Sequence, residues 1–179
     1  MKYMRMLSLL LLAVATLPSM LWAQNPQAPS VQCQFEALNL AVTFPKTVSP
    51  QVREAQNGIT VRAEAGVQGT TYKLVARTSP QTTTDAVRLQ HFKVYADTYM
   101  QALGDAELKE EKRVQWLGRE ALQMSYSIPN DGTVLHVVHR FQLTDGKAIV
   151  AELYRPGEMP SMEDAEEFFG SFRLTTPAE

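Results

Sequence analysis

Residues 121–154 read ALQMSYSIPNDGTVLHVVHRFQLTDGKAIVAELY, and apolar and polar side chains alternate through three successive runs of this stretch. Such alternation is typical of strands with one buried face. Asn130-Asp131-Gly132 separates the first two runs and Asp145-Gly146 separates the last two, and both are signals of tight hairpins. The stretch therefore predicts three consecutive antiparallel strands. These strands are Ala121–Ile128, Thr133–Leu143 and Lys147–Tyr154.

A long helix is predicted ahead of these strands, because apolar residues recur there in steps of three and four. The resulting stripe consists of Leu89, Phe92, Ala96, Tyr99 and Leu103. The residues predicted to point away from it are Arg88, Lys93, Asp97 and Gln101. Thr82 to Thr84 supply capping hydroxyls, and Gly104 ends the helix. The charged segment Glu107–Trp116 then predicts a fourth strand, with a charged extension of the helix as the alternative.

Further elements flank this centre. Phe35–Phe44 alternates as a strand and stops at Pro45, since proline cannot donate to a strand ladder. Asn57-Gly58 is a turn signal ahead of a hairpin over residues 59–65 and 72–77. Near the end of the chain, Ser161 begins a short helix with the pattern of a capping box. Its predicted inward residues are Ala165, Phe168, Phe169 and Phe172. Arg173 to Thr175 follow as a last short strand.

These elements predict the α+β class, with an antiparallel β-sheet packed by one long and one short helix. A striped helix must bury its stripe, and the sheet is the surface available for that. The predicted domain spans residues 33–175, between a flexible leader at 24–32 and a tail at 176–179. With 179 residues the chain has the length of one ordinary domain.

The first 23 residues have the anatomy of a secretory signal peptide. Lys2 and Arg5 precede an apolar run from Leu7 to Leu17, and Ala23 offers the small residue that a signal peptidase needs. The run is shorter than the roughly 20 residues that span a bilayer, so an uncleaved anchor is the lesser alternative. We therefore expect a periplasmic or secreted protein without stable membrane insertion. The net charge of −2, with no basic stripe among aromatic residues, argues against nucleic-acid binding.

His136 and His139 are three residues apart, a spacing that invites a metal-site interpretation. The surrounding alternation predicts a strand, on which positions three apart point to opposite faces. A shared metal ion is therefore not expected, and His139 is interpreted as a hydrogen-bonded core histidine. The sequence also lacks a nucleophile elbow, a phosphate-binding loop and a dinucleotide fingerprint. We predict no catalytic, cofactor-binding or metal site.

Three other features have ordinary structural interpretations. Cys33 is the one cysteine of the chain, and we expect a half-buried thiol, with pairing between two chains as the alternative. An acidic group invites a calcium-site interpretation but is more typical of charges that favour a helix N-terminus. Its members are Glu158, Glu163, Asp164, Glu166 and Glu167. Trp116 ends a charged strand that is expected at a sheet edge, and it is the aromatic residue best placed for a partner.

The chain resembles the PsbP type of domain and the related Mog1-like and bacterial exported lipoprotein domains. Four motifs carry the resemblance along residues 35–174. They are Val42-Thr43-Phe44-Pro45, Gly118-Arg119-Glu120-Ala121, Asp145-Gly146-Lys147-Ala148 and Phe168-Phe169-Gly170-Ser171-Phe172. The resemblance implies an α/β/α-like sandwich, and it implies an accessory or binding factor rather than an enzyme. The lipid-anchor cysteine of the lipoprotein relatives is missing, which argues for a soluble form.

Three functional hypotheses follow. The first is an exported, non-catalytic accessory domain that binds another envelope or secreted protein. The second is a small-ligand carrier with a pocket between the long helix and the sheet, lined by Tyr95, Tyr99 and His139. The third, ranked below both, is an unrecognised hydrolase, which would need His139 beside a carboxylate or hydroxyl in a cleft. The identity of the partner and the oligomeric state stay open.

Overall fold

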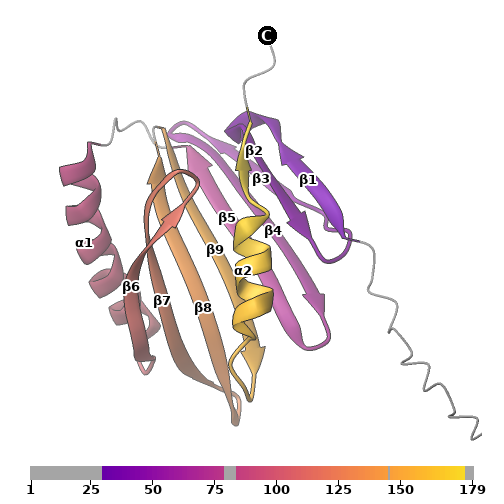
Figure 1. The fold of residues 1–179 in the computed structure, drawn as a ribbon, viewed down its shortest axis with the longest axis vertical. Helices are drawn as coiled ribbons and strands as arrows, with labels where there is room; N and C mark the ends of the chain where they lie inside the picture. The colour runs from indigo at the N-terminus through magenta and orange to yellow at the C-terminus, as the bar shows by residue number, and fades with distance from the viewer. Residues whose placement is uncertain (1–29, 79–83, 145, 176–179) are drawn as a thin grey trace, which may run out of the picture.

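The computed structural model describes residues 30–78, 84–144 and 146–175, within which ten strands form two antiparallel sheets. The strands of the first sheet are β3 (Gln51–Ala55), β4 (Gly58–Val67), β5 (Thr70–Thr78), β6 (Glu107–Trp116), β7 (Arg119–Asn130), β8 (Thr133–Thr144) and β9 (Lys147–Pro156). The strands of the second are β1 (Val31–Phe35), β2 (Leu40–Phe44) and β10 (Arg173–Leu174). The helices are α1 (Asp85–Leu103), α2 (Met162–Gly170) and the 3-10 turn η1 (Glu36–Leu38). The predicted α+β class is confirmed (Figure 1).

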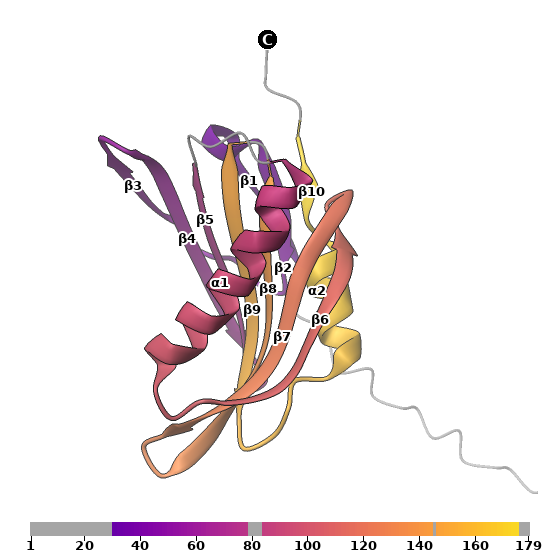
Figure 2. The same ribbon diagram turned by 90° about the vertical axis from the view of Figure 1, so that its left-hand side faces the viewer.

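The seven-stranded sheet has the order β3-β4-β5-β9-β8-β7-β6 and separates two layers. Helix α1 lies across one face, while α2 and the β1-β2-β10 sheet cover the other (Figure 2). Each face has its own hydrophobic cluster, one containing Phe92 of α1 and the other Phe168 and Phe169 of α2. Both faces of the sheet are therefore buried, and the apolar area removed from water on each face is the main contribution to the stability of the fold.

The predicted meander is confirmed in register. Strands β7 and β8 meet at the pair Asn130–Thr133, and the two residues between them, Asp131 and Gly132, both have positive φ angles. That conformation is the two-residue turn whose twist matches a hairpin, and glycine adopts it without steric cost. Strands β8 and β9 pair from Leu135–Pro156 to Thr144–Lys147. Local turn chemistry therefore sets the order of three adjacent strands.

Residues Glu107–Trp116 form strand β6, so the strand prediction is confirmed and the helical alternative is wrong. β6 is an edge of the seven-stranded sheet, and most of its side chains are exposed. Its register with β7 shifts between Leu108 and Glu110. Charged side chains and a bulge both discourage another chain from adding to a sheet edge.

The predicted strand Phe35–Phe44 is wrong in its first half. The chain instead forms β1, the 3-10 turn η1 and then β2, because Asn39 adopts a left-handed conformation between the turn and the strand. Leu38 in the turn and Leu40 in the strand are both buried. Because they are two residues apart, the sequence shows the same alternation as a continuous strand. Strand β1 begins at Val31, two residues before the predicted domain start. Strand β3 was not predicted, since all five of its residues are exposed and leave no apolar pattern.

Helix α1 begins and ends as predicted, and its apolar stripe is confirmed from Phe92 onward but is wrong in the first turn. Thr84 caps it by accepting a hydrogen bond from the Val87 N–H, and Gly104 follows the last helical residue. Arg88, predicted outward, is only 5 % exposed, whereas Leu89, predicted in the stripe, is 45 % exposed. The fully buried line runs through Arg88, Phe92 and Ala96 at intervals of four. Arg88 keeps its charge paired there through Asp85, one turn away.

Helix α2 begins at a well-formed cap, and this supplies a first test. The Ser161 hydroxyl accepts a hydrogen bond of 3.0 Å from the Asp164 N–H. We expect Ser161→Ala to lower the free energy of unfolding by about 1 kcal/mol in urea titration, because an N–H of the first turn loses its partner. Thr84→Ala is the matched variant and should cost less, since its bond to Val87 is longer, at 3.4 Å. Equal losses would contradict this ranking of the two caps.

The predicted signal peptide (1–23), most of the leader and the tail (176–179) lie outside the described residues. Among the helices that are described, none combines the length and the apolar character needed to cross a bilayer.

Candidate functional site

A polar cluster lies buried between α1 and the seven-stranded sheet. Glu152 on β9 is directly opposite His139 on β8 and Lys73 on β5, so the strand register alone brings the three side chains together. Helix α1 adds Tyr95 and Tyr99, four residues apart on one helical face. With Tyr126 of β7, these residues form what we call the Glu152 cluster.

Both oxygens of Glu152 are satisfied. The Lys73 Nζ donates to Oε2 at 2.7 Å, and the His139 Nδ1 lies 2.9 Å from Oε1. The Tyr99 hydroxyl donates to Oε1 at 2.5 Å, and the Tyr126 hydroxyl lies 3.0 Å from that of Tyr99. Through these hydrogen bonds Glu152, on β9, links helix α1 with strands β5, β7 and β8.

The charges around Glu152 determine its protonation. Burial alone would raise the pKa of this carboxyl group, but His139 and Lys73 outweigh burial and hold it well below the usual range. Because a carboxylate only accepts hydrogen bonds, the proton between the two groups belongs to the His139 Nδ1. Burial, together with the nearby Glu152, raises the pKa values of Tyr95, Tyr99 and Tyr126, so the three phenols stay protonated at neutral pH.

The contacts of His139 bear on three expectations. Its side chain is 0 % exposed and hydrogen-bonded to Glu152 and Tyr95, which confirms the predicted core histidine. Tyr95 stacks on Phe141 with ring centroids 3.7 Å apart, so the rings expected to line a carrier pocket fill this space instead. His139 does lie beside a carboxylate and hydroxyls, as the hydrolase hypothesis requires, but within the core rather than in a cleft.

Acid should weaken the Glu152 cluster selectively. A carboxyl group whose folded pKa lies below its unfolded value of about 4.3 contributes stability that is complete above that value and is lost as the pH falls toward the folded pKa. We expect the stability gap between the native chain and Glu152→Gln to narrow by about 1 kcal/mol or more between neutral pH and roughly pH 3. Urea titrations at the two pH values measure it. Other titrating groups are common to both chains, so a constant gap would contradict the depressed pKa of Glu152.

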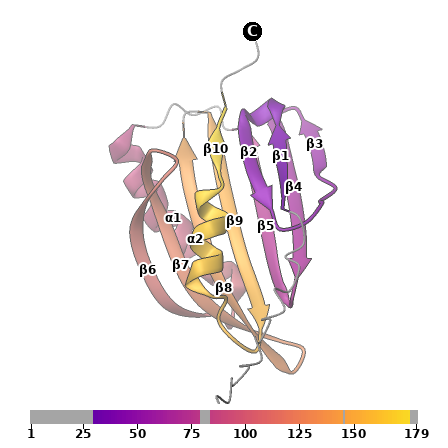
Figure 3. The same ribbon diagram turned by 45° about the vertical axis from the view of Figure 1, so that its right-hand side comes forward.

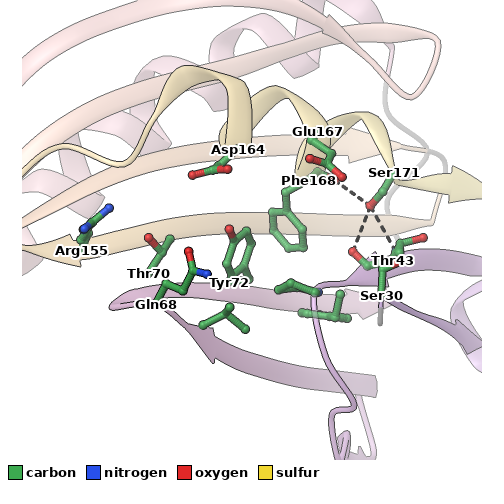
Figure 4. A pocket seen from close by; sticks show the side chains of 13 residues that line it. Ser30, Thr43, Gln68, Thr70, Tyr72, Arg155, Asp164, Glu167, Phe168 and Ser171 are labelled. Atoms are coloured by element: carbon green, nitrogen blue, oxygen red, sulfur yellow. Dashed lines mark hydrogen bonds between the residues drawn. The ribbon is translucent and has the colours of Figure 1, made fainter. Parts of the chain in front are cut away.

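The opposite face of the sheet holds an open cavity of about 540 Å³ between α2, the end of β2 and the β4–β5 hairpin, which we call the α2 pocket (Figure 4). Its floor is aromatic, because the Tyr72 and Phe168 rings meet edge to face at 5.3 Å and Phe44 packs against Phe168 at 5.5 Å. At one end, the Ser171 hydroxyl accepts from the Thr43 N–H at 3.1 Å and joins α2 to β2. The pocket thus has a fixed shape set by three elements.

Polar groups in the α2 pocket lack internal partners. Asp164 and Glu167 of α2 form no ion pair within the described ranges, and their carboxylates reinforce burial in raising the pKa of Tyr72. Arg155 at the far end is already paired with Glu158 at 2.6 Å. Thr70 is only 4 % exposed, yet its hydroxyl faces the cavity without a hydrogen-bond partner in the described part of the chain (Figure 4). The lining therefore carries two solvent-accessible carboxylates that have no ion-pair partner among the described residues.

Comparison with known proteins gives a fold. Neither a family model nor a curated protein matches the sequence. The solution structure of cyanobacterial PsbP from Synechocystis superposes with a TM-score of 0.55 at 14% identity, covering 82% of this chain and 93% of that one. The chain has a PsbP-like fold. A protein from Bacteroides thetaiotaomicron superposes with a TM-score of 0.53 at 11% identity over 86% of this chain, which spans about half of that protein's length.

The closing aromatic motif, residues 168–172, packs into the core of this domain. Helix α2 lies against the seven-stranded sheet (Figure 3). Its side chains Phe168 and Phe169, with Phe172 just beyond its end, are buried there, and Trp116 packs against Phe169 and Phe172. Trp116 is 5 % exposed, and its Nε1 donates to the Phe169 carbonyl at 2.8 Å. The expectation that Trp116 is available to a partner is therefore wrong. Strand β6 is an edge, as predicted, but its last side chain points into the core.

The structure places the remaining predicted residues apart from one another. Cys33 is half-buried on β1, as expected, and desolvation raises its pKa. Of the acidic group, Glu166 pairs with Arg140 at 2.5 Å on the far side of α2 from the pocket. Asp164 and Glu167 line the pocket, a role that sequence reasoning missed. Helical spacing puts them on one face, but only the tertiary fold shows that β2 and β5 stand opposite.

Proposed function

We propose that this protein is an exported, non-catalytic binding domain that docks on another envelope or secreted protein through the α2 pocket. The main support for this proposal is a contrast between two polar sites. The Glu152 cluster satisfies its own charges, whereas the α2 pocket leaves Asp164, Glu167 and Thr70 without partners on an open cavity. A preformed hollow with an apolar floor and a few convergent polar groups is the usual form of a recognition site.

Two further points support this proposal. The signal-peptide pattern of residues 1–23 supports export to the periplasm or beyond the cell. The PsbP-like fold supports an accessory role by analogy of fold alone. Among the described side chains, the histidine with a carboxylate partner is His139, which is enclosed in the core and separated from the α2 pocket by the sheet. The lining of the pocket itself contains no histidine in the part of the chain described.

A small-ligand carrier is the second candidate, because a volume of about 540 Å³ lies within the range of small-molecule sites. In that case the ligand would occupy the α2 pocket rather than the space beneath α1. The two candidates differ in what the pocket holds in the cell.

Site-specific photo-crosslinking separates them. We would place benzoylphenylalanine at Gln68 on the pocket rim and, as the matched control, at Val94 on the exposed side of α1. Irradiation of cells that naturally make the protein should give one discrete protein adduct from position 68 and none of that size from position 94. A folded protein that gives no protein adduct at position 68 would overturn the docking proposal. Co-purification of a small molecule would then favour the carrier.

A further inference from the structure

We propose that the α2 pocket recognises a basic side chain, lysine or arginine, on an exposed segment of the partner protein. This inference rests on the proposed function and names the chemistry of the partner. The charges of the pocket lining favour a cation. Asp164 and Glu167 extend from successive turns of α2 without a counter-charge in the described residues, and Arg155 is neutralised by Glu158. A cation entering the cavity would complete two charge-assisted interactions.

The aromatic floor of the pocket suits the apolar stem of such a side chain. Tyr72 and Phe168 present aromatic surface beneath the two carboxylates (Figure 4). Lysine and arginine have long apolar stems that pack on such surfaces while the charged head stays polar. A cation above an aromatic face gains a further attraction. A purely apolar side chain would satisfy the floor and leave the carboxylates unpaired.

A third feature of the lining is independent of the acidic pair. Thr70 is more than nine-tenths buried, and its unpartnered hydroxyl points into the cavity from the sheet side (Figure 4). A hydroxyl oxygen can accept a hydrogen bond from an ammonium or guanidinium group. The side chain therefore supplies a third oxygen on the wall that faces Asp164 and Glu167.

Two other occupants fit less well. A metal ion is disfavoured, since the described residues contain no group of three histidine, cysteine, aspartate or glutamate side chains that could hold one. The chain's own segment 24–29, QNPQAP, precedes Ser30 at the pocket but contains neither lysine nor arginine. We therefore assign the basic group to another polypeptide.

Titration of the purified protein with short blocked peptides, followed by two-dimensional NMR, tests the inference. The probes are acetyl-Gly-Lys-Gly-amide, its arginine analogue, and versions with norleucine or glutamate in the central position. Lysine and arginine peptides should shift the amide signals of Thr70, Tyr72 and Phe168. They should bind about tenfold more tightly than the norleucine peptide, which corresponds to about 1.4 kcal/mol. Added salt should weaken the binding.

Variants identify the groups responsible. The double variant Asp164→Asn, Glu167→Gln should weaken the lysine peptide about tenfold. Glu163→Gln is the matched control, because Glu163 lies in the first turn of the same helix outside the pocket lining. Its affinity for the peptide should be unchanged. Helical content and the spectrum of the free protein establish that each variant is folded.

Failure of this inference is distinguishable from failure of the proposed function. Equal binding of the norleucine and lysine peptides, or absence of shifts at the pocket, would overturn the basic-side-chain inference. An adduct at position 68 obtained in the same study would still support docking through the pocket. Selective lysine binding without any adduct would instead overturn the proposed function and leave the pocket chemistry supported.

Discussion

Glu152→Gln is expected to lower the free energy of unfolding by about 3 kcal/mol, the lower end of what removal of one partner from a buried charge pair costs. The substitution keeps the size of the side chain but removes its charge. His139 and the Lys73 ammonium then lose the carboxylate between them. The partial exposure of Lys73 reduces the loss, because solvent can replace part of its interaction.

Equilibrium urea unfolding of the variant and the native chain measures this loss. Glu64→Gln is the matched control, since Glu64 is an exposed carboxylate on β4 that also accepts a hydrogen bond from a tyrosine, Tyr154. It should change the stability by no more than about 0.5 kcal/mol. Similar small effects of the two substitutions would show that the Glu152 cluster does not hold α1 to the sheet.

Phe169→Ala is expected to be the most destabilising single substitution on the α2 side, at about 4 kcal/mol. The ring is fully buried, lies edge to face against Trp116 with centroids 6.1 Å apart, and has the Arg140 guanidinium 4.3 Å from its centroid. Truncation leaves a cavity between α2 and the sheet that rigid neighbours cannot fill. It also removes the aromatic face beneath a buried cation.

Two comparisons make this prediction specific. Phe169→Leu retains most of the volume and should cost far less than the alanine variant. Met162→Ala, on an exposed side chain of the same helix, should be nearly neutral. If Phe169→Ala unfolded at the same urea concentration as Met162→Ala, α2 would not be anchored by its aromatic residues. The α2 pocket would then lack the fixed wall that our proposals require.

The parts of the fold that were predictable are those set by local chemistry. Alternation and paired turn residues at Asn130 and Gly132 predicted the meander, and spacing with caps at Thr84 and Ser161 predicted both helices. Elements without such a signature were missed. Strand β3 is wholly exposed, and the left-handed Asn39 divides what reads as one strand. Both features are local hairpins, β3 with β4 and β1 with β2, but neither leaves an alternating pattern that marks where its strands begin and end.

The candidate site was predicted less well, for a related reason. His139 was placed in the core correctly. The positions of its partner Glu152 and of the three tyrosines of the Glu152 cluster follow from strand order, which sequence spacing does not give. Trp116 was expected to be available to a partner because its charged strand is predicted at a sheet edge, whereas its side chain is buried beside α2. The α2 pocket forms only where α2, the end of β2 and the β4–β5 hairpin meet. No local pattern encodes that meeting.

The most direct test of docking through the α2 pocket is to map the partner residue that crosslinks to position 68, by tandem mass spectrometry of the adduct. We predict one partner protein and a crosslinked peptide that contains a lysine or arginine beside the modified residue. The adduct should be lost in Asp164→Asn, Glu167→Gln and retained in Glu163→Gln. Adducts that are the same from positions 68 and 94, or that survive the double variant unchanged, would contradict it.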